Sequence, residues 1–378
     1  MTVDAEERLD STALLSAADP ADMLRQVASS AAQVRSAVRA TQDADLDELT
    51  SAGRPRAIVV TGMGGSGVAG DVMAAVCGRG CPVQILPVHD YQLPAWVGAA
   101  DLVIAVSCSG GTEETIAAAT AAVQRGCRLI GVGGENSPLA MIAQQARAPF
   151  IGVPSAGMPR STLWGLSMPL VVIASRLGLL DAGAEDYESA AAELERISHL
   201  CRPDSESFVN PAKTLALELA GTLPMIWGSS PLAGVAAYRF GSQLSENAKY
   251  PGVIGTLPEA NHNQVVTFDG PFAAGPDGIG GGLSLDEPGD GPAVPLRLVL
   301  LRDSQEHPQV ARRREESARL AEERGIRVTE LAAADGGPLE RLASLVQLID
   351  YGTVYLAIAL GIDPGPIAAI QELKARIA

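Results

Sequence analysis

Three hydroxyl side chains lie within six residues of one another after an apolar segment. Ser107, Ser109 and Thr112 follow "DLVIAV" and precede the alanine-rich "IAAATAAV". A helix that begins here directs its first backbone N–H groups and the positive end of its dipole at one place. These hydroxyls and amides could bind the three terminal oxygens of a phosphate monoester. An ordinary helix cap with Thr112 as the capping residue explains the same residues equally well.

A second turn of this kind lies earlier in the chain. "GMGGSG", residues 62–67, follows another apolar segment, and its glycines would let the backbone approach an anion closely. Gly62, Gly64 and Gly67 also match the dinucleotide-binding fingerprint, but the acidic residue expected at the end of the next strand is displaced to Asp90. Two such turns in one sheet favour a phosphate pocket. The predicted pocket takes residues from both turns: Gly65, Ser66, Ser107, Ser109 and Thr112.

The elements around these turns predict a parallel sheet. Apolar segments alternate with helical ones from about residue 57 to 153, which indicates a mostly parallel sheet with helices on both faces. Residues 164–220 are expected to be almost entirely helical. A new alternation begins at "LPMIWGSS", with further strands expected near 264–268 and 296–301. The expected fold class is therefore α/β, with two flavodoxin-like, doubly wound domains in tandem.

Four segments are expected along the chain. They are a helical extension at 1–50, a first domain with the phosphate turns at 51–155, a helical connector at 156–220 and a second domain at 221–378. Residues 270–295 contain 8 Gly and 5 Pro, a density typical of a long mobile loop or linker. An insertion without function is one interpretation of this segment, and a lid over a nearby site is the other.

The overall composition limits the classes of partner and cofactor. A net charge of −16 argues against nucleic acid or an anionic membrane as the main partner. The five cysteines and four histidines never show the spacing of a metal site, so no metal and no cofactor is expected. An odd number of cysteines and no recognisable signal peptide indicate free thiols in the cytoplasm. No apolar segment approaches the roughly 20 residues needed to span a bilayer.

The two turns resemble those of a known family. "GMGGSGVAGD" together with "SCSGGTEET" resembles the sugar isomerase (SIS) domain, whose Ser/Thr-rich turn holds the phosphate of a phosphosugar. Further motifs, in order, resemble the bifunctional phosphoglucose/phosphomannose isomerase family in an actinobacterial-type variant. They are "MPRSTLWG", "SENAKYPG", "EANHNQ", "LRD" and the terminal "YLAIALGIDPGPIAAIQELK". The resemblance extends from about residue 57 to the C-terminus. It implies a cytoplasmic, metal-independent homodimer that isomerises glucose 6-phosphate or mannose 6-phosphate to fructose 6-phosphate through an enediolate.

The resemblance also implies roles for four residues. Glu246 is the base that moves a proton between C2 and C1. His262 opens the sugar ring, and the family's histidine often reaches the site of the neighbouring subunit. Arg160 stabilises the enediolate with a fixed charge. Lys374, near the end of the chain, belongs to the active site.

Each of these residues has a structural alternative. For Glu246 the alternative is a surface ion pair with Lys249 or Lys213. For the histidine it is a hydrogen bond within a turn, for the arginine a salt bridge at a helix entry, and for the terminal lysine an interaction with a helix dipole. The remaining histidines are expected to be structural: His89, His199 and His307.

The chain departs from the family pattern at a few positions. Where the family commonly has "SYSGNTEET", this chain has Cys108 and Gly111, and the phosphate-binding hydroxyls are kept. Where the family commonly has "NHNE", this chain has Gln264. Ile367 replaces a hydroxyl that some members carry and that is linked to acceptance of the mannose epimer. The lost carboxylate at position 264 leaves a second function open, a catalytically impaired, phosphosugar-binding regulatory protein.

Overall fold

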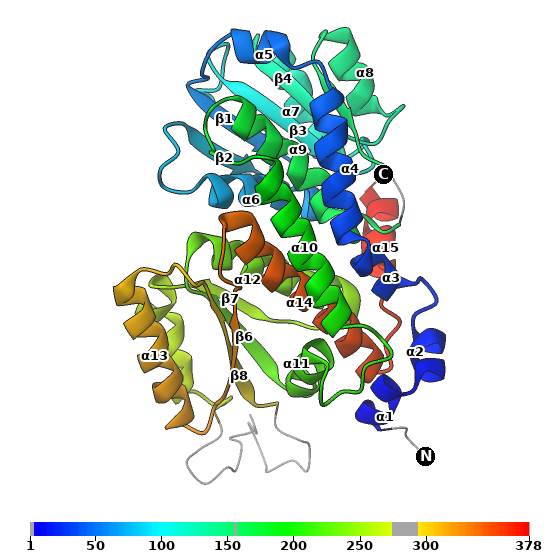
Figure 1. Cartoon of the computed structure of the whole chain (residues 1–378), viewed down its shortest axis with the longest axis vertical. Coiled ribbons are helices and arrows are strands. Elements are labelled where there is room, and N and C mark those ends of the chain that lie inside the picture. The colour runs from blue at the N-terminus through cyan, green and yellow to red at the C-terminus, as the bar shows by residue number, and fades with distance from the viewer. Residues whose placement is uncertain (1–3, 155–156, 274–293, 378) are drawn as a thin grey trace. The chain divides into compact units, whose positions relative to one another are not determined.

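The computed structural model describes residues 4–154, 157–273 and 294–377, which form two compact units (Figure 1). The five-stranded unit comprises Ala28–Glu195 and Gly337–Glu340. The four-stranded unit comprises the three remaining segments: Met1–Val27, Arg196–Gly336 and Arg341–Ala378. Each unit contains one parallel sheet flanked by helices, which confirms the expected α/β fold class. Most of the glycine- and proline-rich segment lies outside the described residues, and the domain boundaries drawn from the sequence remain a prediction.

The sheet of the five-stranded unit has its strands in the order β2-β1-β3-β4-β5, and all neighbours are parallel. The strands are β1 (Ala57–Thr61), β2 (Gln84–Val88), β3 (Leu102–Ser107), β4 (Arg128–Gly133) and β5 (Phe150–Gly152). The chain passes from β1 to β2 on one side and then continues through β3 on the other. This reversal leaves a crevice at the carboxyl ends of β1 and β3, where ligands of such sheets bind. The two predicted phosphate turns follow these two strands.

Helices cover both faces of this sheet. Ile58 and Val60 belong to one buried cluster and Val59 to another, because alternate residues of a strand point to opposite faces. The helices of the first face are α4 (Ser30–Asp43), α5 (Asp47–Ser51), α6 (Val68–Cys77) and α9 (Leu163–Arg176). Those of the second face are α7 (Glu113–Gln124) and α8 (Pro138–Gln145). α10 (Ala184–Leu200) follows α9 in the chain.

The sheet of the four-stranded unit repeats this arrangement with the order β7-β6-β8-β9. Its strands are β6 (Leu223–Gly228), β7 (Val253–Thr256), β8 (Leu296–Arg302) and β9 (Arg327–Ala332), all parallel. The chain again reverses at its first strand, so the crevice of this unit lies between β6 and β8. The helices that lie wholly or mostly in this unit are α1 (Ala5–Asp10), α2 (Thr12–Ala18), α3 (Met23–Ala28), α11 (Pro211–Leu219), α12 (Pro231–Gln243), α13 (Pro308–Glu322), α14 (Pro338–Ala359) and α15 (Ala368–Ile377).

One predicted strand is wrong. Residues 264–268 lie in a 3₁₀ helix, Gln264–Asp269, and the edge strand beside β6 is the earlier segment Val253–Thr256. Val265 and Phe268 both pack on the core, and their separation of three residues matches the period of a 3₁₀ helix. A short apolar segment such as "VVTF" does not distinguish the two conformations.

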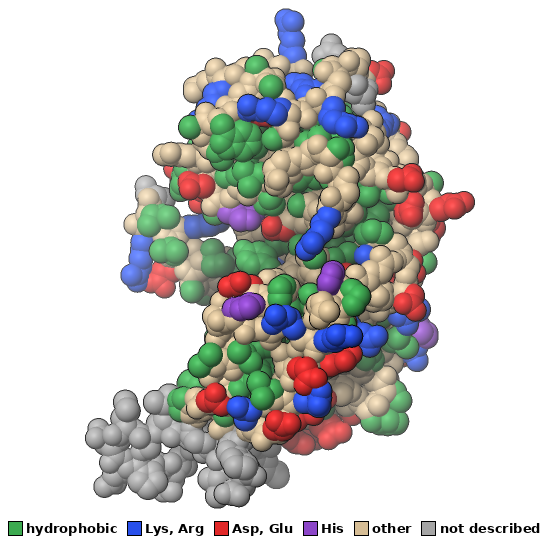
Figure 2. All heavy atoms as spheres, turned by 90° about the vertical axis from the view of Figure 1, so that its left-hand side faces the viewer, with side chains coloured by type: hydrophobic (Ala, Val, Ile, Leu, Met, Phe, Trp, Pro, Cys, Tyr) green, Lys and Arg blue, Asp and Glu red, His purple; other side chains and the backbone are tan. Residues whose placement is uncertain are grey.

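Among the described residues, α14 is the one helix that is long and apolar enough to span a membrane by length and composition. It has 22 residues, and its most apolar 18-residue window has a mean hydropathy of 1.5. However, 94% of its most apolar window is buried inside the structure, as is typical of a core helix. Figure 2 shows acidic and basic side chains interspersed on one face of the molecule.

Candidate functional site

A hydrogen bond joins the two predicted phosphate turns of the five-stranded unit. Ser66 ends the short 3₁₀ helix Gly64–Ser66, directly after β1, and is buried. Its Oγ accepts a hydrogen bond from the backbone N–H of Cys108, 3.1 Å away in the turn after β3. The structure therefore brings the glycine turn and the "SCSGGT" turn together at the crevice of this sheet. Burial raises the pKa of the Cys108 thiol, so this side chain is a neutral part of the turn.

Within the "SCSGGT" turn the hydroxyls are arranged differently from an ordinary helix cap. Thr112 occupies the N-cap position of α7, but its side chain makes no capping hydrogen bond. Its Oγ1 lies 2.9 Å from Ser107 Oγ instead. Ser109 Oγ accepts from the backbone N–H of Gly111 at 3.2 Å and is exposed. The capping alternative for Thr112 therefore does not describe this turn.

Gly110 is required by the shape of the same turn. Its φ is 64°, a left-handed conformation that favours glycine. A Cβ atom at this position would lie 2.0 Å from Ser137 Oγ. Ser137 caps α8 by accepting from the N–H of Ala140, so α8 fixes the far side of the turn.

His89, which was expected to be structural, packs on the glycine turn. Its Nδ1 lies 2.9 Å from the carbonyl oxygen of Gly62, and a Cβ atom at Gly67 would lie 2.8 Å from the imidazole ring. Its Nε2 lies 3.7 Å from Asp71 Oδ2. Asp71 raises the pKa of His89, against the opposing effect of burial, and the Gly62 carbonyl adds to the rise. No local pattern around His89 indicates this contact.

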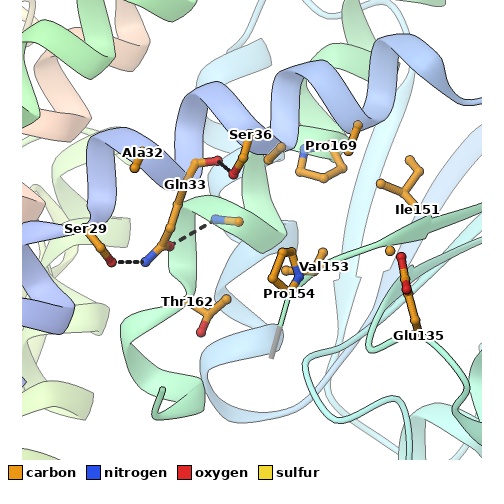
Figure 3. Close-up of a pocket in the computed structure, with 14 residues that line it drawn as sticks. Ser29, Ala32, Gln33, Ser36, Glu135, Ile151, Val153, Pro154, Thr162 and Pro169 are labelled. Carbon is orange, nitrogen blue, oxygen red and sulfur yellow. Dashed lines mark hydrogen bonds between the residues drawn. The ribbon is translucent and has the colours of Figure 1, made fainter. Parts of the chain in front are cut away.

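Arg160 lies in a 3₁₀ turn, Pro159–Ser161, that packs on the glycine turn. A Cβ atom at Gly65 would lie 3.5 Å from Arg160 Cα, and the Arg160 side chain is buried. Gln33 of α4 holds this turn in place. Its Nε2 donates to the Ser161 carbonyl at 2.8 Å. Its Oε1 accepts from the N–H of Gly165 at 3.3 Å (Figure 3). Sequence reasoning missed Gln33, because it lies far from Arg160 along the chain.

A cavity of about 750 Å³ lies beside Gln33 in the same unit (Figure 3). Its walls come from α4, α9, the end of β5 and the loop after β4, including Glu135 and Thr162. None of the residues predicted to bind phosphate or to act in catalysis lines this cavity. The candidate site is thus defined by the crevice turns and not by the cavity.

Glu246 lies in a π-helical turn, Leu244–Ala248, that extends α12 in the four-stranded unit. It is half-buried, and π-turns of this kind are frequent at functional sites. The neighbouring Asn247 is buried and fixes the turn. Its Nδ2 donates to Gln243 Oε1 at 3.1 Å and to Thr353 Oγ1 of α14 at 3.0 Å. Glu246 is therefore carried by a rigid, unusual backbone.

Lys249 and Lys213, named above as alternative partners of Glu246, both bind backbone carbonyls. Lys249 Nζ donates to the carbonyl oxygens of Glu246 and Asn247, each at 3.1 Å, and to that of Asp363 at 2.9 Å. These contacts satisfy carbonyl groups at the end of a helix. Lys213 is buried, and its Nζ donates to the carbonyl of Ser205 at 2.6 Å.

His262 and Lys374 lie on two further elements of the four-stranded unit. His262 is exposed at the end of a 3₁₀ helix, Glu259–His262. Lys374 is exposed on α15, a helix without buried residues. Of the residues predicted to act in catalysis, Arg160 alone belongs to the five-stranded unit, and it is packed on a predicted phosphate turn. Their catalytic roles remain predictions.

Gln264, which replaces the glutamate common in the family, has a role in the fold. Its Oε1 accepts from Trp227 Nε1 at 2.6 Å, and its Nε2 donates to the Ile254 carbonyl at 2.9 Å. The side chain therefore joins β6 to β7 and uses both an acceptor and a donor, which only the amide supplies near neutral pH. Among the described residues, no group of three His, Cys, Asp or Glu side chains could hold a metal ion.

Comparisons with known proteins agree with this arrangement. Residues 208–377 match the family model of the "Bacterial phospho-glucose isomerase C-terminal SIS domain". A protein of Caldicellulosiruptor bescii named "Bifunctional phosphoglucose/phosphomannose isomerase" is 31% identical over 323 residues, which cover 85% of this chain and 89% of that protein. A protein of the same name from Aquifex aeolicus is 28% identical over 84% of this chain and 89% of its own. A hypothetical protein from Thermus thermophilus has a similar fold, with a TM-score of 0.71 and 15% identity over 99% of this chain and 93% of its own.

Proposed function

Because the chain belongs to the bifunctional phosphoglucose/phosphomannose isomerase family, we propose that it is an aldose–ketose isomerase of hexose 6-phosphates. It interconverts fructose 6-phosphate with glucose 6-phosphate, mannose 6-phosphate or both. The main support for this proposal is the similarity to the relative from Caldicellulosiruptor bescii, since the match covers 89% of that protein. The joined hydroxyl turns at the crevice of the five-stranded unit support it independently.

These turns are the proposed phosphate site. The hydroxyl of Thr112 faces Ser107 and not the helix, so it is placed with the neighbouring serines to donate to phosphate oxygens. The free amides at the start of α7 and the positive end of its dipole add to the attraction. The proposed ligands are backbone or side-chain groups of five residues: Gly65, Ser66, Ser107, Ser109 and Thr112.

The proposed reaction transfers a proton between C2 and C1 of the open-chain sugar. Glu246 takes the proton from one carbon and returns it to the other, and its place in a π-turn, a conformation frequent at functional sites, supports this role. Arg160 and Lys374 stabilise the enediolate oxygen with positive charge. His262 exchanges protons with the ring oxygen and the anomeric hydroxyl. No metal takes part in this proposal.

The proposed assembly is a homodimer in the cytoplasm, in which His262 completes the site of the neighbouring subunit. The exposure of His262 on one chain supports this part of the proposal. The second candidate function, a regulatory protein without turnover, rested on Gln264. Since the Gln264 amide bridges two strands, its replacement of a glutamate is explained by the fold and does not favour that candidate.

The test is an assay of fructose 6-phosphate formation from glucose 6-phosphate and from mannose 6-phosphate, with and without EDTA. We expect turnover of at least one aldose phosphate that EDTA does not reduce. Binding of both sugar phosphates without conversion of either would show a regulatory protein instead. Loss of turnover in EDTA would contradict the metal-independent reaction.

A further inference from the structure

Each unit has the same hydrogen bond at the same place in its sheet. In the five-stranded unit, Cys108, after β3, donates its backbone N–H to Ser66 Oγ, after β1, at 3.1 Å. In the four-stranded unit, Asp303, after β8, donates its backbone N–H to Ser229 Oγ, after β6, at 2.9 Å. Both bonds cross the crevice where the strand order reverses. Asp303, in the "LRD" motif, is therefore the counterpart of Cys108.

The two crevices differ in charge, because the four-stranded unit has the carboxylate of Asp303 where the five-stranded unit has the neutral thiol of Cys108. In the four-stranded unit the Asp303 carboxylate itself is surrounded by donors. Its Oδ2 accepts from Ser230 Oγ at 2.6 Å, and its Oδ1 accepts from the N–H of Gln305 at 3.2 Å. Arg341 Nε lies 2.9 Å from the same Oδ1 as an ion pair. A hydroxyl, a backbone amide and a guanidinium are the donor types that bind a phosphate.

A helix dipole adds to this arrangement. Ser230 caps α12, a helix of 13 residues, by accepting from the N–H of Ala233 at 3.0 Å. The carboxylate that binds Ser230 therefore lies at the positive end of this helix, where an anion is stabilised. Asp303 is 3% exposed and Arg341 is 6% exposed, so bulk water solvates neither charged group. Without the carboxylate, the crevice would hold an uncompensated buried cation.

We propose that the crevice of the four-stranded unit is an anion site whose ligand is the chain's own Asp303 carboxylate. The site is thereby filled from within, and external phosphate is excluded from it. One consequence, which rests on the proposed function, is that each chain binds one phosphosugar and not two. The role of Asp303 itself does not depend on that function.

The test is rescue of Asp303→Ala by a small external anion. We expect a lowered midpoint of thermal unfolding, Tm, that sodium acetate raises by about 3 °C more than sodium chloride of equal ionic strength, because acetate replaces the missing carboxylate. Wild type and the double variant Asp303→Ala/Arg341→Met should show no such difference. The matched control is Asp350→Ala, which removes another buried carboxylate of this unit, 2.6 Å from Arg239 between two helix interiors. Equal effects of acetate on Asp303→Ala and Asp350→Ala would overturn the proposal.

A second measurement does not require Asp303→Ala to fold. Equilibrium dialysis of wild-type chain with labelled inorganic phosphate should give one bound phosphate per chain, and Ser109→Ala/Thr112→Ala should abolish it. Two phosphates per chain, or one that survives this double substitution, would overturn the exclusion from the second crevice. No bound phosphate in wild type, together with acetate rescue of Asp303→Ala, would contradict the proposed function while upholding the internal ligand.

Discussion

The hydroxyl of Thr112 lies 2.9 Å from the hydroxyl of Ser107, across the turn that links β3 to α7. Thr112 stands at the N-cap of α7 without capping it. Because the Thr112 hydroxyl makes no bond to the helix, the first backbone amides of α7 and the positive end of its dipole remain available to another acceptor. This relationship favours an external anion as the partner of the turn.

The first prediction removes hydroxyls from this turn. Ser109→Ala/Thr112→Ala should raise the KM for fructose 6-phosphate by about 100-fold or more, since each lost hydrogen bond to a charged group contributes about 1.5–3 kcal/mol. The turnover number should change much less. Steady-state kinetics measure both constants, with Thr120→Ala on the exposed side of α7 as the matched control. An unchanged KM would place the phosphate elsewhere.

The second prediction concerns the proposed base. Glu246→Gln keeps the size of the side chain but removes its ability to accept a proton. We expect kcat to fall by about 10²–10⁴-fold with a nearly unchanged KM. Glu316→Gln, an exposed glutamate of α13, is the control and should behave like wild type. If Glu246→Gln retained close to wild-type turnover, another group would have to be the base.

The strands and turns were predictable where burial is nearly complete. β1 and β3 are buried along their whole length, so their apolar runs were recognised, as were the glycine and serine turns that follow them. β7 was missed because it is a short edge strand and only partly buried, which leaves no clear apolar pattern. The 3₁₀ helix at 264–269 carries β-branched residues and was mistaken for a strand.

The contacts that complete the site were not predictable in the same way. Gln33 lies 128 residues from Ser161, whose carbonyl it binds, and His89 lies 27 residues from Gly62. Such contacts depend on how distant elements pack, and neither side chain carries a local motif. Gln264 is the opposite case, because its sequence did carry a signal and the signal was misleading. Its departure from the family motif suggested that a catalytic group was lost, whereas the structure shows that its side chain hydrogen-bonds to both β6 and β7.

The third prediction follows from the raised pKa of His89. A raised pKa means that the folded state holds the proton more tightly than the unfolded state. The resulting stability is fully present below the ordinary value of about 6.5 and is lost as the pH rises through the raised value. Asp71→Asn should bring the pKa of His89 down and reduce this pH dependence, because Asp71 is the main cause of the rise.

NMR titration of the His89 ring in wild type and Asp71→Asn tests this prediction directly. Thermal unfolding between pH 6 and 8.5 gives the accompanying change in stability. His199→Gln, which replaces an exposed histidine beside Arg202, is the control for removal of an imidazole elsewhere in the chain. The same titration midpoint for His89 in both proteins would refute the role of Asp71.

The fourth prediction restores the residue common in the family. In Gln264→Glu, one carboxylate oxygen can still accept from Trp227 Nε1. The other would replace the Gln264 Nε2 group, which donates to the Ile254 carbonyl at 2.9 Å, so two oxygens without a proton between them would face each other. We expect the free energy of unfolding at pH 8 to fall by about 1–3 kcal/mol. A protonated glutamate can donate to that carbonyl, so the loss should shrink toward pH 5. Urea unfolding at both pH values measures it.

The kinetics of the same variant separate the two candidate functions. If Gln264 serves the fold alone, Gln264→Glu should have a kcat no higher than that of wild type. Gln264→Leu, which lacks both polar groups, should then be destabilised to the same extent at pH 5 and at pH 8. A Gln264→Glu variant that is as stable as wild type at pH 8 and turns over faster would show that the amide impairs catalysis. That outcome would revive a regulatory role for the natural chain, because a single carboxylate would then separate a binding protein from an isomerase.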